Sequence, residues 1–136
     1  MKMNNNNDMK IVPKFIYPNA ETYKFIIYDQ NNKKSGIYRW VNLISGKSYV
    51  GSSVNLTKRL GNYYSLNYLK NSLKKNPSII YRSLLKQGYS NFSLEILEYC
   101  EPNLLTSREQ YYIDLLKPEY NILKIAGSRL GTKHTE

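Results

Sequence analysis

The first half of the chain alternates hydrophobic and polar residues in a pattern that predicts a β-hairpin. Residues 36–42 and 47–51 are both rich in β-forming side chains, and the pair Ser45-Gly46 lies between them. A glycine-containing turn between two short alternating runs is typical of two antiparallel strands. Further along, residues 92–99 begin with hydrophobic side chains at every second position, which predicts a third strand.

The stretch that follows the hairpin predicts a helix with two functional side chains on one side. Asn55 is a good N-cap residue. Leu56, Leu60 and Tyr63 then follow at the spacing of a buried helical face. Arg59 lies one turn before Tyr63, so these two side chains should project together.

Prolines and glycines delimit the remaining helical segments. Residues 67–75 predict a short helix or turn. Pro77 opens a helix that Gly88 ends. Pro102 begins a last long helix, which Pro118 stops.

The last helix carries one acidic residue, Glu109, within an otherwise hydrophobic stripe. The stripe consists of Leu105, Tyr112 and Leu116. An ionised carboxylate on a buried face has a large desolvation cost unless it is paired, hydrogen-bonded or bound to a metal. From the periodicity alone two explanations stay open: an ion pair with a basic residue such as Arg108 or Arg82, and a metal ligand.

The hydrophobic pattern changes near both ends of the chain. Residues 1–11 are polar and Asn-rich, and we expect them to be disordered. Residues 12–35 combine apolar runs with two prolines and a polar connector, so we expect an arm packed on the main domain. That domain should span residues 36–125, and residues 126–136 have the polar, turn-rich character of a linker.

Composition and charge favour a nucleic-acid partner. The 136 residues, 41% of them hydrophobic, fit one compact domain, and no stretch is apolar enough to span a membrane, so no membrane partner is expected. Twenty Lys and Arg against ten Asp and Glu give a net charge of +10. Six basic and three acidic residues precede position 36, and fourteen and seven follow, so the surplus is not confined to a tail. Such a surplus favours phosphate contacts and counterion release.

Several chemistries are disfavoured by the residues that are scarce. A lone Cys100 can form neither an internal disulfide nor a thiolate cluster. His134 is the only histidine and lies in the terminal stretch, which argues against a histidine base, a Ser-His-Asp triad and a His-ligated zinc site. Tyrosine can accept a proton only if its pKa of about 10 is lowered by cations or a metal. With fourteen tyrosines in the chain, composition alone selects none of them.

Two tripeptides resemble the signature from which GIY-YIG nucleases are named. Gly36-Ile-Tyr38 is followed, after ten intervening residues, by Tyr49-Val-Gly51, in which Val replaces the central Ile. An Arg in the next helix, a Glu in a late helix and an Asn beyond it recur in the family's order as Arg59, Glu109 and Asn121.

The resemblance covers residues 36 to about 125 and is greatest to fungal mitochondrial, intron-encoded homing endonucleases. It implies an α+β fold with a small three-stranded antiparallel sheet flanked by helices. It also implies one-step hydrolysis of a DNA phosphodiester by a water attacking in line, with one divalent ion, Mg²⁺ or Mn²⁺, on the leaving side. Double-stranded DNA is then the expected partner. No small-molecule cofactor is expected, a monomer is favoured, and the mitochondrion is the expected location.

The resemblance assigns a role to each matched residue. Tyr38 would be the general base, and Tyr49 would position the nucleophile or the scissile phosphate. Arg59 would neutralise charge on the phosphate in the transition state, and Glu109 would hold the metal. Tyr63 falls where family members place a His or Tyr that supports the phosphate or the base.

Three further details follow from the comparison with the family pattern. Asn121 matches the family Asn that stabilises the geometry of the active site. Some relatives carry a Lys just after the second tripeptide, so here Lys47 or Lys58 would have to reach in. Residues 128–136 resemble the start of a truncated DNA-binding modular repeat.

Two other functions share parts of this pattern. The first is a catalytically silent nucleic-acid-binding module for intron RNA or DNA, motivated by the charge and the aromatic side chains. The second is a structure-specific repair nuclease, which would share the chemistry and differ in substrate.

Overall fold

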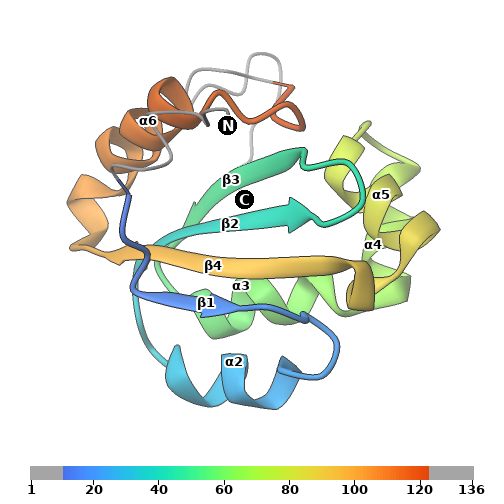
Figure 1. Ribbon diagram of the computed structural model, residues 1–136, viewed down its shortest axis with the longest axis horizontal. Helices are drawn as coiled ribbons and strands as arrows, with labels where there is room; N and C mark the ends of the chain where they lie inside the picture. The colour runs from blue at the N-terminus through green and yellow to red at the C-terminus, as the bar shows by residue number, and fades with distance from the viewer. Residues whose placement is uncertain (1–10, 123–136) are drawn as a thin grey trace, which may run out of the picture.

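A four-stranded antiparallel sheet forms the centre of the molecule (Figure 1). The structure is a computed structural model that describes residues 11–122. The predicted linker at 126–136, the predicted N-terminal tail except Ile11, and His134 lie outside the described residues. The strands occur in the order β1-β4-β2-β3. Their bounds are Phe15–Tyr17 (β1), Gly36–Asn42 (β2), Ser48–Ser53 (β3) and Phe92–Tyr99 (β4).

The α+β class is confirmed, but the prediction of three strands is wrong by one. The fourth strand is β1, which pairs with β4 from Phe15↔Ile96 to Tyr17↔Leu94. A strand of three residues between two prolines is too short to show a period of two, so the hydrophobic pattern could not reveal it. Its backbone pairs with an edge of β4 that would otherwise be open.

Side-chain caps begin three of the helices, of which only the cap at Asn55 was predicted from the sequence. Asn55 accepts a hydrogen bond from Lys58 N, Ser65 from Tyr68 N and Ser78 from Tyr81 N, so each satisfies a backbone donor of a first turn. The helices are α2 (Lys24–Gln30), α3 (Leu56–Tyr63), α4 (Leu66–Leu73), α5 (Ile79–Gln87), α6 (Leu105–Leu116) and the short 3₁₀ turns η1 (Tyr89–Asn91) and η2 (Pro102–Leu104). Lys117 ends α6 in the left-handed conformation, directly before Pro118.

The segment before β2 contributes to the main core. Tyr17, Ala20 and Ile27 are buried in that core together with residues of the sheet. Asn31 is also buried; its Nδ2 donates to Tyr17 Oη at 3.1 Å, and its Oδ1 accepts from Tyr99 Oη at 2.8 Å. These contacts join the segment after α2 to both β1 and β4.

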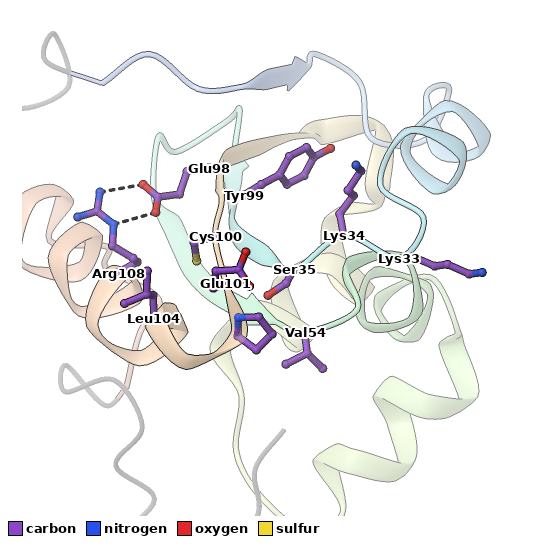
Figure 2. Close-up of a pocket in the computed structure, with 11 residues that line it drawn as sticks. Lys33, Lys34, Ser35, Val54, Glu98, Tyr99, Cys100, Glu101, Leu104 and Arg108 are labelled. Carbon is purple, nitrogen blue, oxygen red and sulfur yellow. Dashed lines mark hydrogen bonds and ion pairs between the residues drawn. The ribbon is translucent and has the colours of Figure 1, made fainter.

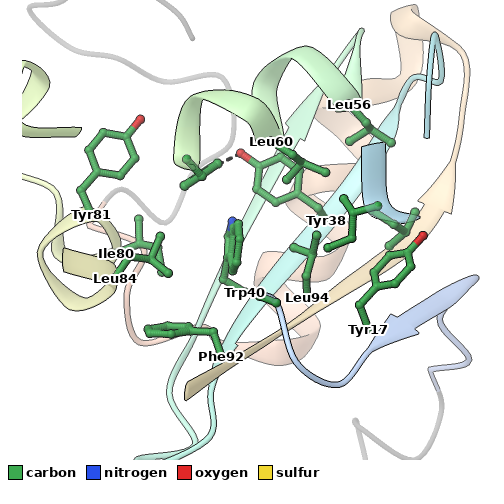
Figure 3. Packing of buried hydrophobic residues seen from close by; sticks show 14 of the residues in the cluster. Tyr17, Tyr38, Trp40, Leu56, Leu60, Ile80, Tyr81, Leu84, Phe92 and Leu94 are labelled. Atoms are coloured by element: carbon green, nitrogen blue, oxygen red, sulfur yellow. Dashed lines mark hydrogen bonds between the residues drawn. The ribbon is translucent and has the colours of Figure 1, made fainter. Parts of the chain in front are cut away.

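The two faces of the sheet have separate cores. On one face, Tyr38 and Trp40 of β2 point toward α3. Figure 3 shows them in one cluster with Leu56 and Leu60 of α3. On the other face, α6 packs its hydrophobic stripe on a second cluster that includes Ile37 and Val50. Since side chains alternate between faces, β2 and β3 expose residues to both cores. None of the helices within residues 11–122 is long and apolar enough to cross a membrane.

Candidate active site

A chain of hydrogen bonds links three of the predicted site residues on the α3 face of the sheet. The phenol oxygens of Tyr38 and Tyr63 lie 2.9 Å apart, and both side chains are buried. Arg59 Nη2 donates to Tyr63 Oη at 3.4 Å, and the guanidinium lies 4.5 Å from the Tyr63 ring centroid. The prediction that Arg59 and Tyr63 project together is therefore confirmed.

Tyr81 of α5 completes this group, although the sequence pattern did not single it out. Arg59 Nη2 donates to Tyr81 Oη at 2.9 Å, and the rings of Tyr63 and Tyr81 meet edge to face at 5.5 Å. Arg59 is thus held between two phenols that come from α3 and α5. The only sequence feature that could have indicated Tyr81 was the buried face of α5, which Tyr81 shares with Ile80 and Leu84.

Gly51 leaves the space that the Tyr38 ring occupies. Tyr38 and Gly51 are direct partners across β2 and β3. A Cβ atom at Gly51 would lie 2.5 Å from Cζ and Oη of Tyr38, which is too close for any real contact. A Cβ at Gly36 would lie 2.3 Å from the backbone oxygen of Glu98. Both glycines of the two tripeptides therefore permit close approaches.

Tyr49 lies on the same face as Tyr38. It pairs with Trp40 across the hairpin, and directly opposed residues of two strands share a face. Tyr49 is half-buried and packs against the core that contains Tyr38 and Tyr63. The second tripeptide thus brings its tyrosine to the same side of the sheet as the first.

Burial and charge act in opposite directions on the tyrosines of this group. Burial raises the pKa of Tyr38 and of Tyr63, and the positive charge of Arg59 lowers it in part. Burial alone would lower the pKa of Arg59, but the surrounding phenols of Tyr63, Tyr38 and Tyr81 outweigh it, so its pKa lies above the ordinary value. Arg59 therefore stays charged, and both buried phenols keep their protons at neutral pH.

Glu109 lies on the opposite face of β3. Ser52 Oγ donates to Glu109 Oε1 at 2.5 Å, and Ser52 alternates with Gly51 along the strand. Arg108, one of the ion-pair partners considered for Glu109, instead donates to Glu98 from both Nε and Nη2, at 2.7 and 2.8 Å. These bonds lower the pKa of the Glu98 carboxyl, mainly through Arg108. The half-buried Glu109 carboxylate is thus oriented by a hydroxyl on the edge strand.

Asn121 binds the free edge of β3 at the centre of the second tripeptide. Its Oδ1 accepts from Val50 N and its Nδ2 donates to Val50 O, both at 2.9 Å. Two neighbouring contacts extend this pairing, because Tyr120 N donates to Ser48 O and Ser48 N donates to Glu119 Oε1. Residues 119–121 therefore satisfy the backbone of an edge strand that carries site residues on both faces.

The six predicted residues thus surround one strand. Tyr38, Tyr49, Arg59 and Tyr63 lie on the α3 face, Glu109 lies on the α6 face, and Asn121 lies at the edge between them. Lys47 and Lys58, the two lysines that could reach into the site, are both exposed. Within the described residues, neither side chain is hydrogen-bonded to the six predicted residues.

A surface pocket lies at the end of the sheet where β2 begins and β4 ends (Figure 2). The Glu98–Arg108 ion pair forms part of its wall, and Lys34 extends beside the Tyr99 ring, 5.5 Å from its centroid. None of the six predicted site residues lines it. The candidate site is therefore the surroundings of β3 and not this pocket.

Comparisons with known proteins show the family of the chain. The GIY-YIG catalytic domain family matches residues 34–121. The chain is 30% identical to a probable intron-encoded endonuclease, bI1, of Neurospora crassa over 96% of its own length, and 32% identical to probable intron-encoded endonuclease 1 of the same fungus over 76%. These alignments cover 30% and 34% of the relatives, so the chain spans about a third of their length.

Two solved structures have a similar fold. Both are of the catalytic domain of the intron endonuclease I-TevI, at 32% and 33% identity with TM-scores of 0.55 and 0.52. They match 70% and 66% of this chain and 99% of theirs. The family match, the curated relatives and the arrangement around β3 agree, and the chain belongs to the GIY-YIG endonuclease family.

Proposed function

We propose that this domain hydrolyses phosphodiester bonds of double-stranded DNA with one divalent metal ion, as the catalytic part of an intron-encoded homing endonuclease. The observation that supports this most is the arrangement around β3. A permanently charged Arg59 in a cluster of phenols lies on one face of the strand, and an oriented carboxylate, Glu109, lies on the other. A phosphodiester at the edge of β3 would meet both a cation and a metal ligand.

The residues present fit a single Mg²⁺ or Mn²⁺ held by Glu109. Within residues 11–122, no cluster of three or more His, Cys, Asp or Glu could form a complete metal cage. Mg²⁺ does not need such a cage, since it keeps several waters and usually takes one or two carboxylates together with phosphate oxygens. When bound, the ion would neutralise charge on the phosphate and on the leaving oxygen. Ser52 would keep the Glu109 carboxylate in one orientation for this contact.

Arg59 is the group that would neutralise the phosphate. Its guanidinium carries a fixed charge. Its bonds to Tyr63 and Tyr81 use Nη2 only, so the N–H groups of Nε and Nη1 stay available for a phosphate. Tyr63 would have two roles. Its ring packs against the Arg59 guanidinium and its hydroxyl accepts a hydrogen bond from Arg59, and the same hydroxyl is hydrogen-bonded to that of Tyr38.

The base role assigned to Tyr38 has a definite electrostatic requirement. Burial raises the pKa of Tyr38, so the phenol must lose its proton late, when the phosphate and the metal are in place. Arg59 is the nearby cation that stabilises the resulting phenolate. Tyr49, half-buried on the same face, would position the water or the phosphate. Replacing each tyrosine with Phe and recording the rate against pH tests this division: Tyr38→Phe should remove the rise of the rate with increasing pH, while Tyr49→Phe should lower the rate at every pH.

Nicking of supercoiled plasmid DNA tests the proposed function. The full chain should nick with Mg²⁺ and stop with EDTA, and Glu109→Gln should lower the rate by at least about a hundredfold while DNA binding persists. Asp114→Asn, an exposed carboxylate on the same helix, is the matched control and should nick normally. Full activity of Glu109→Gln would rule out its role as the metal ligand.

The origin of the gene is a separate part of the proposal. The names of the two Neurospora relatives support an intron-encoded endonuclease, and we place the protein in the mitochondrion on that basis. Mapping the reading frame to an intron of an organelle genome would test this. Size-exclusion chromatography with and without a DNA duplex would test the expectation of a monomer.

A further inference from the structure

Acidic residues are missing from the segment of the chain that carries Arg59. Between Asp29 and Glu95 the sequence has no Asp or Glu, and it has eleven Lys and Arg. A compositional bias toward lysine would act along the whole chain and would not by itself remove acids from one half. The segment without acids includes all of α3, α4 and α5.

The basic residues of α4 and α5 are exposed. Lys70 lies in the last turn of α4, Lys74 and Lys75 follow it directly, and Arg82 and Lys86 lie one turn apart on α5. All five side chains are exposed, and no ion pair among residues 11–122 involves any of them. We call these five residues the α4–α5 basic surface. Its charge is uncompensated and available to an anion.

All acidic side chains lie outside this segment of the sequence. Glu109 and Asp114 lie on α6, Glu95 and Glu98 lie on β4, and Glu119 accepts a hydrogen bond from Ser48 N at the start of β3. Figure 1 shows α6 on one side of the molecule and α4 and α5 together on the opposite side, near the β2–β3 turn. A polyanion would therefore be attracted to the α4–α5 side.

The basic surface adjoins the candidate active site through Tyr81. The Arg59 guanidinium leaves α3 and reaches α5, where it binds Tyr81 Oη. Tyr68 of α4 packs on the Tyr81 ring at 6.4 Å and is 38% exposed, so α4 also borders this point. A phosphate bound by Arg59 would thus lie beside both helices.

We infer that the α4–α5 basic surface is the docking site for the DNA duplex next to the scissile phosphate. This inference rests on the proposed function and adds where the substrate lies. Duplex DNA carries one negative charge per about 1.7 Å of its axis. A nine-residue helix such as α5 has a length of about 13 Å, so α4 and α5 can meet several phosphates in a row.

The salt dependence of DNA binding tests this inference. Lys70→Gln, Lys74→Gln and Lys86→Gln are combined in the full chain, and the Kd for a fluorescent duplex is measured in EDTA over a range of KCl concentrations. Each lost phosphate contact lowers the slope of log K against log salt by about 0.9, so a reduction of about 2 to 3 is expected for any duplex sequence. Affinity near 0.1 M salt should fall at least about tenfold.

A second triple variant supplies the matched control. Lys14→Gln, Lys33→Gln and Lys117→Gln remove the same charge from equally exposed positions outside α4 and α5. The control should change the slope by less than 1. Equal slopes for the two triple variants, or tighter binding of an intron RNA than of the duplex, would overturn the inference. A parent chain that binds with the expected slopes but never cuts would refute the proposed function and leave the docking surface in place.

Discussion

Tyr81 Oη accepts a hydrogen bond of 2.9 Å from Arg59 Nη2, which joins α5 to the charged group of the candidate site. The rest of the guanidinium lies over the Tyr63 ring. A long, flexible side chain is thus held by one bond from α5 and one ring from its own helix. Fixing a charged group before the reaction is the usual way in which a protein makes its charge effective in a transition state.

Removing the Tyr81 hydroxyl should therefore affect turnover more than folding. We expect Tyr81→Phe to lower kcat about tenfold with little change in KM or in the urea midpoint, because the ring still packs and only the bond that orients Arg59 is lost. Single-turnover nicking and urea denaturation measure both effects. In an Arg59→Lys background, Tyr81→Phe should cost nothing further, whereas additive losses would show that Tyr81 acts independently of Arg59. Tyr68→Phe is the control on the neighbouring helix.

Gly51 offers a second test, at the contact between the two tripeptides. In Gly51→Ala the new methyl would lie 2.5 Å from the Tyr38 phenol, so the ring must move. We expect the protein to lose about 1–3 kcal/mol of stability and most of its activity, as for other overpacked cores. Gly61→Ala is the matched control, because its nearest contact would be Tyr28 Oη at 3.9 Å and alanine favours a helix. The control should be neutral or slightly stabilising. Equal behaviour of the two variants in urea and nicking assays would contradict the close approach.

Asn121 should act through the position of β3. Its amide makes one donor and one acceptor bond to Val50, and an aspartate can keep only the acceptor bond. In Asn121→Asp the carboxylate would face the Val50 carbonyl oxygen, and we expect a loss of about 1–3 kcal/mol in urea denaturation together with reduced nicking. Asn121→Gln tests whether the amide chemistry suffices without the correct length. If Asn121→Asp keeps full stability and loses only activity, Asn121 contacts the substrate and does not merely hold the strand.

Burial of the phenols should make the fold sensitive to high pH. Burial raises the pKa of Tyr38 and Tyr63, and it raises the pKa of Tyr89 and of Tyr112 to about 12. In the unfolded chain tyrosines lose their protons near pH 10, so above that pH the unfolded state binds fewer protons than the folded state. The stabilisation from these phenols is complete below about pH 10 and is lost as the pH rises toward their folded values. Urea midpoints should stay level from pH 8 to about pH 10 and fall between there and pH 11. Tyr89→Phe should make the fall shallower, and the exposed Tyr111→Phe should not.

The sequence predicted those parts of the fold that depend on local periodicity. The hairpin, the strand at residues 92–99 and the cap at Asn55 all follow from neighbours within a few positions, and the structure confirms them. Glu109 stood out because one carboxylate interrupted a hydrophobic stripe. Its Ser52 partner could not be predicted, since the two residues are 57 positions apart and no pattern links them.

Tyr81 shows why a site can be incomplete when it is read from the sequence. It is one of fourteen tyrosines, and it lies 22 positions from the arginine that it binds. Its role depends on how α5 packs against α3, which is a tertiary fact. The short strand β1 was missed for the related reason that three residues carry no period of their own.

The residues before β2 should be needed for stability, although the family match begins only at residue 34. Tyr17 and Ile27 are buried in the main core, and β1 covers one edge of β4. Burying each of these large side chains contributes about 1.5–3 kcal/mol, so deleting residues 1–33 should lower the free energy of unfolding by at least about 3 kcal/mol. The uncovered β4 edge should also promote association, which size-exclusion chromatography would detect. Deleting residues 1–10 is the control and should leave stability and the monomer unchanged, because this segment is polar and Asn-rich and has little apolar surface to bury. This role would be contradicted if a shortened protein that starts at residue 34 stayed monomeric and unfolded at the parent's urea midpoint. The nuclease fold would then not require β1.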